Sequence, residues 1–128
     1  MVFRLSGQIT NHLIWRKIEV VFLSDEYGAV SESLTGQPGD PAKGAEVLSK
    51  RSLGNCVACH SVTEMLEDVA WHGNVGPMLD GIGDIYTEAE LRGLVANAKM
   101  TFEGTVMPAF FKADGYIRPG DAYTGKAP

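Results

Sequence analysis

Two cysteines and a histidine stand together as Cys56-Val57-Ala58-Cys59-His60, and the chain has no other cysteine. This C-x-x-C-H string is the attachment pattern of a c-type haem. In that chemistry the two thiols add across the two vinyl groups of the haem, and the adjacent imidazole binds the iron. We therefore predict that Cys56 and Cys59 tether one haem c and that His60 is an axial iron ligand.

Other kinds of site also contain two cysteines at this spacing, namely a thioredoxin-like dithiol, a structural disulfide and half of a zinc site. A tetrahedral zinc site needs further ligands, and the only other histidines are His12 and His72. A thioredoxin-like motif follows a strand and opens a helix, whereas this one follows a predicted helix and Gly54. The haem prediction is therefore preferred over these alternatives.

An electron-transfer haem with two axial ligands commonly has a Met thioether opposite the His, and this ligand raises the reduction potential. Met107 is the preferred candidate because it precedes Pro108 and lies in an extended loop that Thr105 and Pro108 can hold rigid. The remaining methionines are Met1, Met65, Met78 and Met100, of which the last two stay open as alternatives.

A metal-bound histidine usually donates its other ring N–H to a carbonyl or carboxylate, which fixes its tautomer and orientation. The predicted acceptor for His60 is the backbone carbonyl of Pro77, in the run Asn74-Val75-Gly76-Pro77. Apolar side chains would form the dry walls of the site, and the candidates are Leu79, Ile82, Leu91, Leu94, Phe102, Phe110 and Phe111. Trp71 and His72 are predicted to be loop residues without a ligand role.

The elements that must position these residues are short helices separated by long loops. Asp40 followed by Pro41 predicts a helix over 41–50, because Asp is a good N-cap and Pro fits the first helical position. Thr87 and Glu90 form a capping-box signature that predicts a helix over 88–98, with apolar residues on one face. The stretch 74–83 holds too many glycines for a helix or strand. The fold class predicted is all-α.

Composition restricts the classes of function. The chain has 128 residues, 11 basic against 16 acidic side chains and a net charge of -5, which fits one domain and argues against nucleic-acid binding. No run reaches the roughly 18 apolar residues of a membrane helix. The run 120–126 has most of a phosphate-loop pattern, but Ala127 replaces its Ser or Thr. The sequence has no Ser/His/Asp set and no pair of carboxylates that would suggest hydrolysis. No catalytic residue is therefore assigned.

Several blocks of the sequence closely resemble the SoxX family, the monohaem c-type subunit of the SoxAX cytochrome of sulfur-oxidising bacteria. The blocks are 34–36, 39–44, 54–60, 73–77, 79–81, 91–93, 97–102, 104–110 and 118–121. The haem string is common to all c-type cytochromes, so the most specific part is the long block from Leu91 to Asp121. The resemblance implies a class I cytochrome c fold around one covalent haem, with Cys56, Cys59, His60, Pro77 and Met107 at the haem-binding positions of the family.

The resemblance also implies partners and a compartment. A SoxX-like subunit works in the periplasm and pairs with a dihaem SoxA subunit, whose own haem carries the sulfur chemistry. That complex, of the L-cysteine S-thiosulfotransferase type, oxidatively joins thiosulfate to a cysteine of the SoxYZ carrier. The SoxX-like subunit accepts the electrons and passes them to a small soluble cytochrome, so it is an electron carrier rather than the catalytic subunit. The alternative is a free-standing monohaem carrier with no catalytic partner.

The sequence departs from the family pattern at both ends. Residues 1–24 carry three basic and one acidic side chain and lack the uninterrupted apolar run of an export signal, so they are predicted to be a doubtful N-terminal extension. Residues 25–128 form the predicted cytochrome c domain. The family continues into a C-terminal helix that packs across the N-terminal one, and this chain is expected to lack it, which predicts a truncated and less stable domain.

Overall fold

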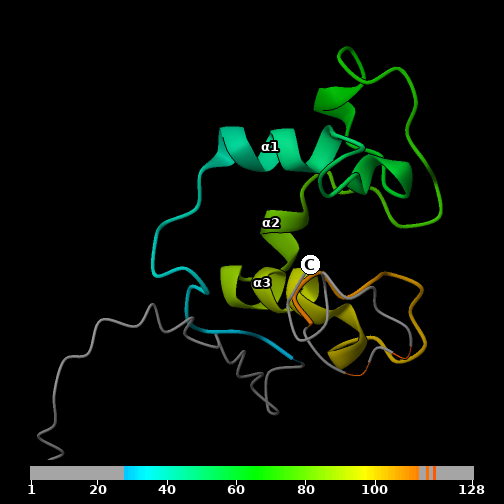
Figure 1. Cartoon of the computed structure of the whole chain (residues 1–128). Coiled ribbons are helices and arrows are strands. Elements are labelled where there is room, and N and C mark those ends of the chain that lie inside the picture. The colour runs from blue at the N-terminus through cyan, green and yellow to red at the C-terminus, as the bar shows by residue number, and fades with distance from the viewer. Residues whose placement is uncertain (1–27, 113–114, 116, 118–128) are drawn as a thin grey trace, which may run out of the picture.

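The computed structural model describes residues 28–112, 115 and 117. Within them the chain forms short helices and loops, with no extended strand among the elements (Figure 1). The elements in chain order are α1 (Pro41–Ser49), η1 (Cys56–Ala58), η2 (Thr63–Met65), α2 (Ile82–Ile85), α3 (Glu88–Asn97) and η3 (Ala98–Met100). The prediction made for residues 1–24 lies outside the described residues.

Helix α1 begins where the sequence predicts. The side chain of Asp40 accepts hydrogen bonds from the backbone N–H groups of Ala42 (3.0 Å) and Lys43 (3.2 Å), and Pro41 occupies the first helical position. These contacts satisfy N–H groups that have no partner inside the helix. The helix ends at Ser49, one residue before the predicted end.

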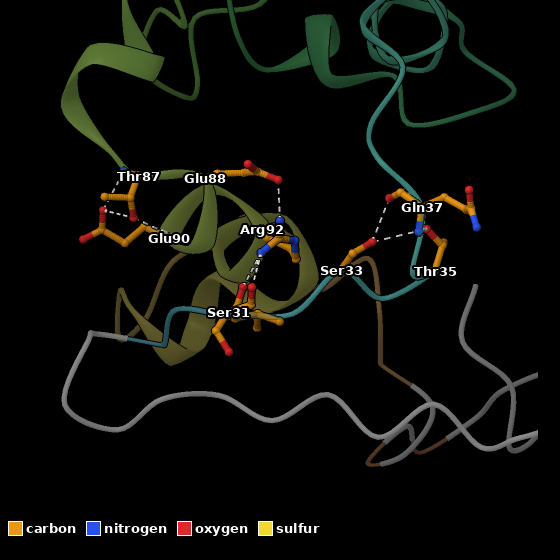
Figure 2. A network of polar contacts seen from close by, with 9 residues as sticks. Ser31, Ser33, Thr35, Gln37, Thr87, Glu88, Glu90 and Arg92 are labelled. Atoms are coloured by element: carbon orange, nitrogen blue, oxygen red, sulfur yellow. Dashed lines mark hydrogen bonds and ion pairs between the residues drawn. The ribbon is translucent and has the colours of Figure 1, made fainter.

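Helix α3 also has the predicted cap. The backbone N–H of Glu90 donates to the Thr87 hydroxyl (3.3 Å), and the backbone N–H of Thr87 donates to the Glu90 carboxylate (2.7 Å). This reciprocal pair confirms the capping box (Figure 2). The α-helix ends at Asn97, and Ala98 already belongs to η3.

The prediction that 74–83 contains no helix is wrong at its last two residues, because α2 starts at Ile82. Gly81 has a φ of 72°, a left-handed conformation that glycine adopts at little cost, and this turn starts the helix. Tyr86 N–H closes it by donating to the Ile82 carbonyl (3.1 Å). A helix of four residues is too short to leave a periodic apolar pattern in the sequence.

The described residues fall into two halves (Figure 1). We call residues 41–80 the His60 half, in which α1 contacts η1, and residues 28–31 together with 86–112 the Met107 half, in which α3 contacts η3. Helix α2 lies between α1 and α3. The two halves therefore each contain one of the two predicted iron ligands.

The segment 28–31, which we call the strap, lies along α3. The backbone N–H of Val30 donates to the Ala89 carbonyl (2.9 Å), and Arg92 Nη1 donates to the carbonyls of Val30 (2.6 Å) and Ser31 (3.1 Å). Arg92 also pairs with Glu88 one turn earlier on α3 (2.5 Å), as Figure 2 shows. Arg92 thus connects the strap to α3 through its guanidinium.

The buried apolar core consists of small side chains. Its members are Ala29, Val30, Val57, Ala96 and Ala98, and all except Val57 belong to the Met107 half. No large side chain of the described residues is fully buried. None of the described helices has both the length and the apolar character that crossing a membrane requires.

Candidate functional site

His60 makes the contact that the sequence predicts. Its Nδ1 lies 2.6 Å from the backbone carbonyl oxygen of Pro77. Since a carbonyl oxygen can only accept, Nδ1 carries the proton in this hydrogen bond, and in the neutral imidazole Nε2 keeps its lone pair. This tautomer is the one in which Nε2 can bind a metal.

A ladder of backbone hydrogen bonds holds the Pro77 segment beside the C-x-x-C-H segment. Gly73 N–H donates to the Val57 carbonyl (2.8 Å), Gly76 N–H to that of Cys59 (2.8 Å), and Leu79 N–H to that of Ser61 (3.0 Å). The loop 73–79 therefore follows 57–61 in parallel. The Pro77 carbonyl is placed against the imidazole by this ladder.

Two side-chain contacts extend the ladder. The Asp80 carboxylate accepts from the backbone N–H of Thr63 (2.9 Å), and hydrogen bonds from the Thr63 side chain and backbone lower the pKa of Asp80. The Val62 N–H donates to Nδ1 of His72 (3.1 Å). His72 lies in a loop, as predicted, and this bond uses one of its ring nitrogens.

Glycine is required at two positions of the ladder. A Cβ on Gly76 would lie 2.6 Å from His60 Nδ1 and 2.7 Å from Nε2, closer than real Cβ contacts allow. A Cβ on Gly73 would collide with the backbone of Ala58 and lie 2.9 Å from the Cα of Cys59. Sequence reasoning assigns neither Gly73 nor Gly76 a functional role. The available signal is their position in the sequence, between His60 and Pro77.

The two cysteines are free thiols at the start and just after the end of η1. The N–H groups of Cys59 (3.0 Å) and His60 (2.9 Å) both donate to the Cys56 carbonyl, so one tight turn contains all three residues. Cys59 is exposed and Cys56 half-buried. Partial burial raises the pKa of the Cys56 thiol, because the thiolate is disfavoured away from water.

Met107 lies in the other half of the molecule and is half-buried. Its backbone N–H donates to the Thr105 hydroxyl (3.2 Å), which agrees with the predicted role of Thr105 in holding this loop. Lys99 Nζ donates to the carbonyls of Thr105 and Met107, both at 2.9 Å. Sequence reasoning missed Lys99, since no local pattern connects it to a loop eight residues further along.

The end of the Met107 loop is attached to α3. The backbone N–H groups of Phe110 and Phe111 donate to the carbonyls of Val95 (3.4 Å) and Ala96 (3.0 Å). The alternative ligands Met78 and Met100 are 57% and 52% exposed. Met107 is the more enclosed of the three.

Many large apolar side chains of the described residues are exposed. Those that are 45% exposed or more include Leu53, Leu66, Trp71, Val75, Ile85, Val95, Phe102 and Val106. The predicted wall residues other than Phe102 are half-buried. A pocket of about 300 Å³ opens beside α3, lined by Tyr86, Glu90, Leu94, Thr101 and Phe102.

The buried face of α3 differs from its apolar face. The spacing of Leu91, Leu94, Val95 and Ala98 predicts one apolar face. Of these, Ala98 is buried, Leu91 and Leu94 are half-buried and Val95 is 56% exposed. The buried positions within α3 itself are Gly93 and Ala96. A Cβ on Gly93 would collide with the Gly28 carbonyl, so the strap lies against the backbone of α3. The larger apolar residues of α3 are therefore only partly covered by the described chain.

These residues fit a covalently bound haem. Two free thiols and an imidazole share one turn, Nε2 retains its lone pair, and large apolar side chains are not covered by the chain's own core. An apolar ring system would cover such side chains and complete the core. Among the described residues no group of three or more His, Cys, Asp or Glu side chains could hold a metal ion, so the zinc alternative has no further ligands there.

Comparison with solved structures shows a strong similarity to a known protein. The chain is similar to the protein in "Crystal structure of SoxXA from P. pantotrophus", with 57% sequence identity and a TM-score of 0.74. The match covers 86% of this chain and 77% of that chain. No family model matches the chain, and neither does any curated protein.

Proposed function

Since this chain belongs to the SoxX family and has a cytochrome c fold of short helices and loops, we propose that it is the haem-carrying electron-transfer subunit of a SoxXA-type complex. The similarity supports a sulfur-oxidation context and a SoxA-type partner. The residue roles below are part of the proposal.

Five residues would hold the haem. Cys56 and Cys59 would form the two thioether bonds, and His60 and Met107 would be the axial iron ligands. Pro77 would keep the His60 ring oriented by accepting its Nδ1–H. When bound, haem c supplies reversible one-electron transfer at its iron.

The protein's own contribution is to hold ligands and exclude water. The ladder between 57–61 and 73–79 fixes the imidazole on one side. The open apolar side chains of α3 and of its neighbouring loops would exclude water from the haem and so help to set its reduction potential. We assign no catalytic residue to this chain.

In the complex, the sulfur chemistry would belong to the haem of a dihaem SoxA-type partner. That chemistry would oxidatively link thiosulfate to a cysteine of a SoxYZ-type carrier, of the L-cysteine S-thiosulfotransferase class. This subunit would accept the released electrons and pass them to a small soluble cytochrome. We place it in the periplasm, the compartment in which c-type haem attachment takes place.

The observation that carries the proposal is the His60–Pro77 hydrogen bond. It joins two motifs 17 positions apart and gives the imidazole of a C-x-x-C-H string the tautomer that an iron ligand needs. A dithiol redox site or a structural disulfide would have no use for an oriented imidazole at this position.

Absorption spectra of the protein matured with haem test the ligand assignment. We expect covalent haem and, in the oxidised state, a Met–iron charge-transfer band that is lost in Met107→Ala. Met78→Ala and Met100→Ala are the matched controls and should keep the band. Loss of the band in a control, or recovery of the protein without covalent haem, contradicts the assignment.

Co-purification tests the proposed role. The tagged holoprotein, expressed together with a dihaem SoxA-type subunit, should recover that subunit in a one-to-one complex. A holoprotein that stays alone yet exchanges electrons with a soluble cytochrome supports the free-standing carrier instead.

A further inference from the structure

We propose that Lys99 is a positioning residue for Met107, because its ammonium group fixes the backbone segment that presents the thioether. This inference rests on the proposed function, in which Met107 is an iron ligand. Lys99 touches neither the sulfur nor any reacting atom in the described contacts. Its role is exerted through the carbonyls of the loop.

The geometry of Lys99 is that of a clamp. Its Nζ donates to the carbonyl oxygens of Thr105 and Met107, each at 2.9 Å. An ammonium group has three donors, so one cation can hold both carbonyls at once. The two acceptors are two residues apart, so one side chain holds both ends of the segment 105–107.

The backbone that carries the Lys99 side chain is itself held in place. Lys99 lies in η3, and its backbone N–H donates to the Asn97 side chain (3.2 Å). The preceding residue, Ala98, is 1% exposed and anchors η3 in the core. Lys99 therefore reaches the loop from a rigid base.

Both backbone polar groups of Met107 are bound by side chains. Its N–H donates to the Thr105 hydroxyl and its carbonyl accepts from Lys99. The next contacts in the loop that join backbone groups are those of Phe110 and Phe111 with α3. Substitution of Lys99 therefore loosens Met107 while the attachment of the loop to α3 remains.

The expected consequence is faster opening of the Met107–iron bond. Imidazole can bind the ferric haem only after the thioether leaves, so its binding rate reports how firmly the loop is held. Lys99→Met removes both hydrogen bonds of an exposed side chain, and for this loss we expect the rate constant to rise about tenfold. The charge-transfer band should weaken in the same variant.

The experiment uses the full-length holoprotein, and imidazole is the probe. Lys43→Met is the matched control, since it removes the same charge from α1 at a side chain that is 80% exposed and pairs only with Asp40 in the described contacts. Lys99→Arg keeps donors for both carbonyls and should restore slow binding. Thr105→Val removes the hydroxyl that holds the Met107 N–H and provides a second, independent loosening of the loop.

The outcomes separate this inference from the proposed function. If wild type shows haem and a Met107-dependent band, but Lys99→Met binds imidazole at the wild-type rate, the inference is wrong and the proposed ligands stand. If Lys43→Met accelerates binding as much as Lys99→Met, the effect is one of net charge and the clamp is refuted. If the wild-type band does not depend on Met107, the ligand assignment fails and the inference fails with it. If Lys99→Met does not fold, the rate in Lys99→Ala decides: a rise supports the role of Lys99 and a wild-type rate overturns it.

Discussion

The two halves of the molecule hold their predicted iron ligands in different ways. In the His60 half, hydrogen bonds between backbone groups align 73–79 with 57–61, and the acceptor for the imidazole is itself a backbone carbonyl. In the Met107 half, the contacts nearest the ligand come from the side chains of Lys99 and Thr105. Single substitutions that remove a contact should therefore act mainly on the Met107 half, whereas the His60 half is sensitive to added atoms.

The halves also differ in how they are packed. Four of the five buried apolar residues lie in the Met107 half, where the strap covers α3. The His60 half contributes only Val57 to this buried set. Its order depends on close backbone approaches at glycines, so a bound haem should add more to its stability than to that of the Met107 half.

The largest expected effect comes from adding one methyl group beside the imidazole. In Gly76→Ala the new Cβ would lie 2.6 Å from His60 Nδ1, so the ring must move away from Pro77 or the ladder must open. We expect loss of haem attachment and a free energy of unfolding lower by about 3 kcal/mol, the upper end for overpacked sites. The haem-to-protein ratio and denaturant unfolding measure both.

Gly83→Ala is the control for that prediction. Gly83 lies in α2, and a Cβ there meets nothing within 4 Å. This variant should keep its haem. Normal haem content and stability in Gly76→Ala would show that the imidazole does not depend on this close approach.

A smaller loss is expected where the strap meets α3. In Gly93→Ala the Cβ would lie 3.1 Å from the Cα of Ala29 and collide with the Gly28 carbonyl, and neither backbone atom can move cheaply. We expect a loss of about 2 kcal/mol in unfolding free energy, with haem attachment retained because the His60 half is untouched.

Gly44→Ala provides the matched comparison, because Gly44 also lies inside a helix but a Cβ there meets nothing within 4 Å. It should gain about 0.5–1 kcal/mol from improved helix propensity. If Gly93→Ala and Gly44→Ala gained the same unfolding free energy, the strap would not lie in close contact with the backbone of α3.

The smallest effect concerns the stability of the fold at acid pH. One carboxylate in each half contributes to it, Asp80 in the His60 half and Glu90 in the Met107 half. Hydrogen bonds from Thr63 lower the pKa of Asp80, and those from Thr87 lower the pKa of Glu90. A carboxyl whose folded pKa is lowered contributes stability above its unfolded pKa and loses it as pH falls through the folded value. For Asp80 this window starts near the ordinary value of 3.8 and extends below it.

Denaturant midpoints measured across that pH range should fall less steeply in Asp80→Asn than in wild type, since an amide does not titrate. Glu90→Gln should flatten the curve in the same way from the Met107 half. If both variants keep the full acid dependence of wild type, the two hydrogen-bonded carboxylates contribute nothing to it.

The sequence by itself determined the features that depend on near neighbours. The spacing of Cys56, Cys59 and His60 pointed to one chemistry, and the Asp40 and Thr87 caps marked the helix starts because each cap bonds to N–H groups two or three residues away. The Pro77 carbonyl was also predicted, since the chemistry of a bound histidine requires an acceptor and the sequence offers one in a loop.

Only the tertiary structure decided the contacts between distant segments. Arg92 and Val30 are 62 positions apart, and no periodicity connects them. The same holds for Gly93, which looks like a weak point of α3 until the strap is seen against it, and for Lys99, which looks like a solvated cation until its ammonium meets two carbonyls. Such contacts depend on where the whole chain places each backbone, and local propensity carries no information about that placement.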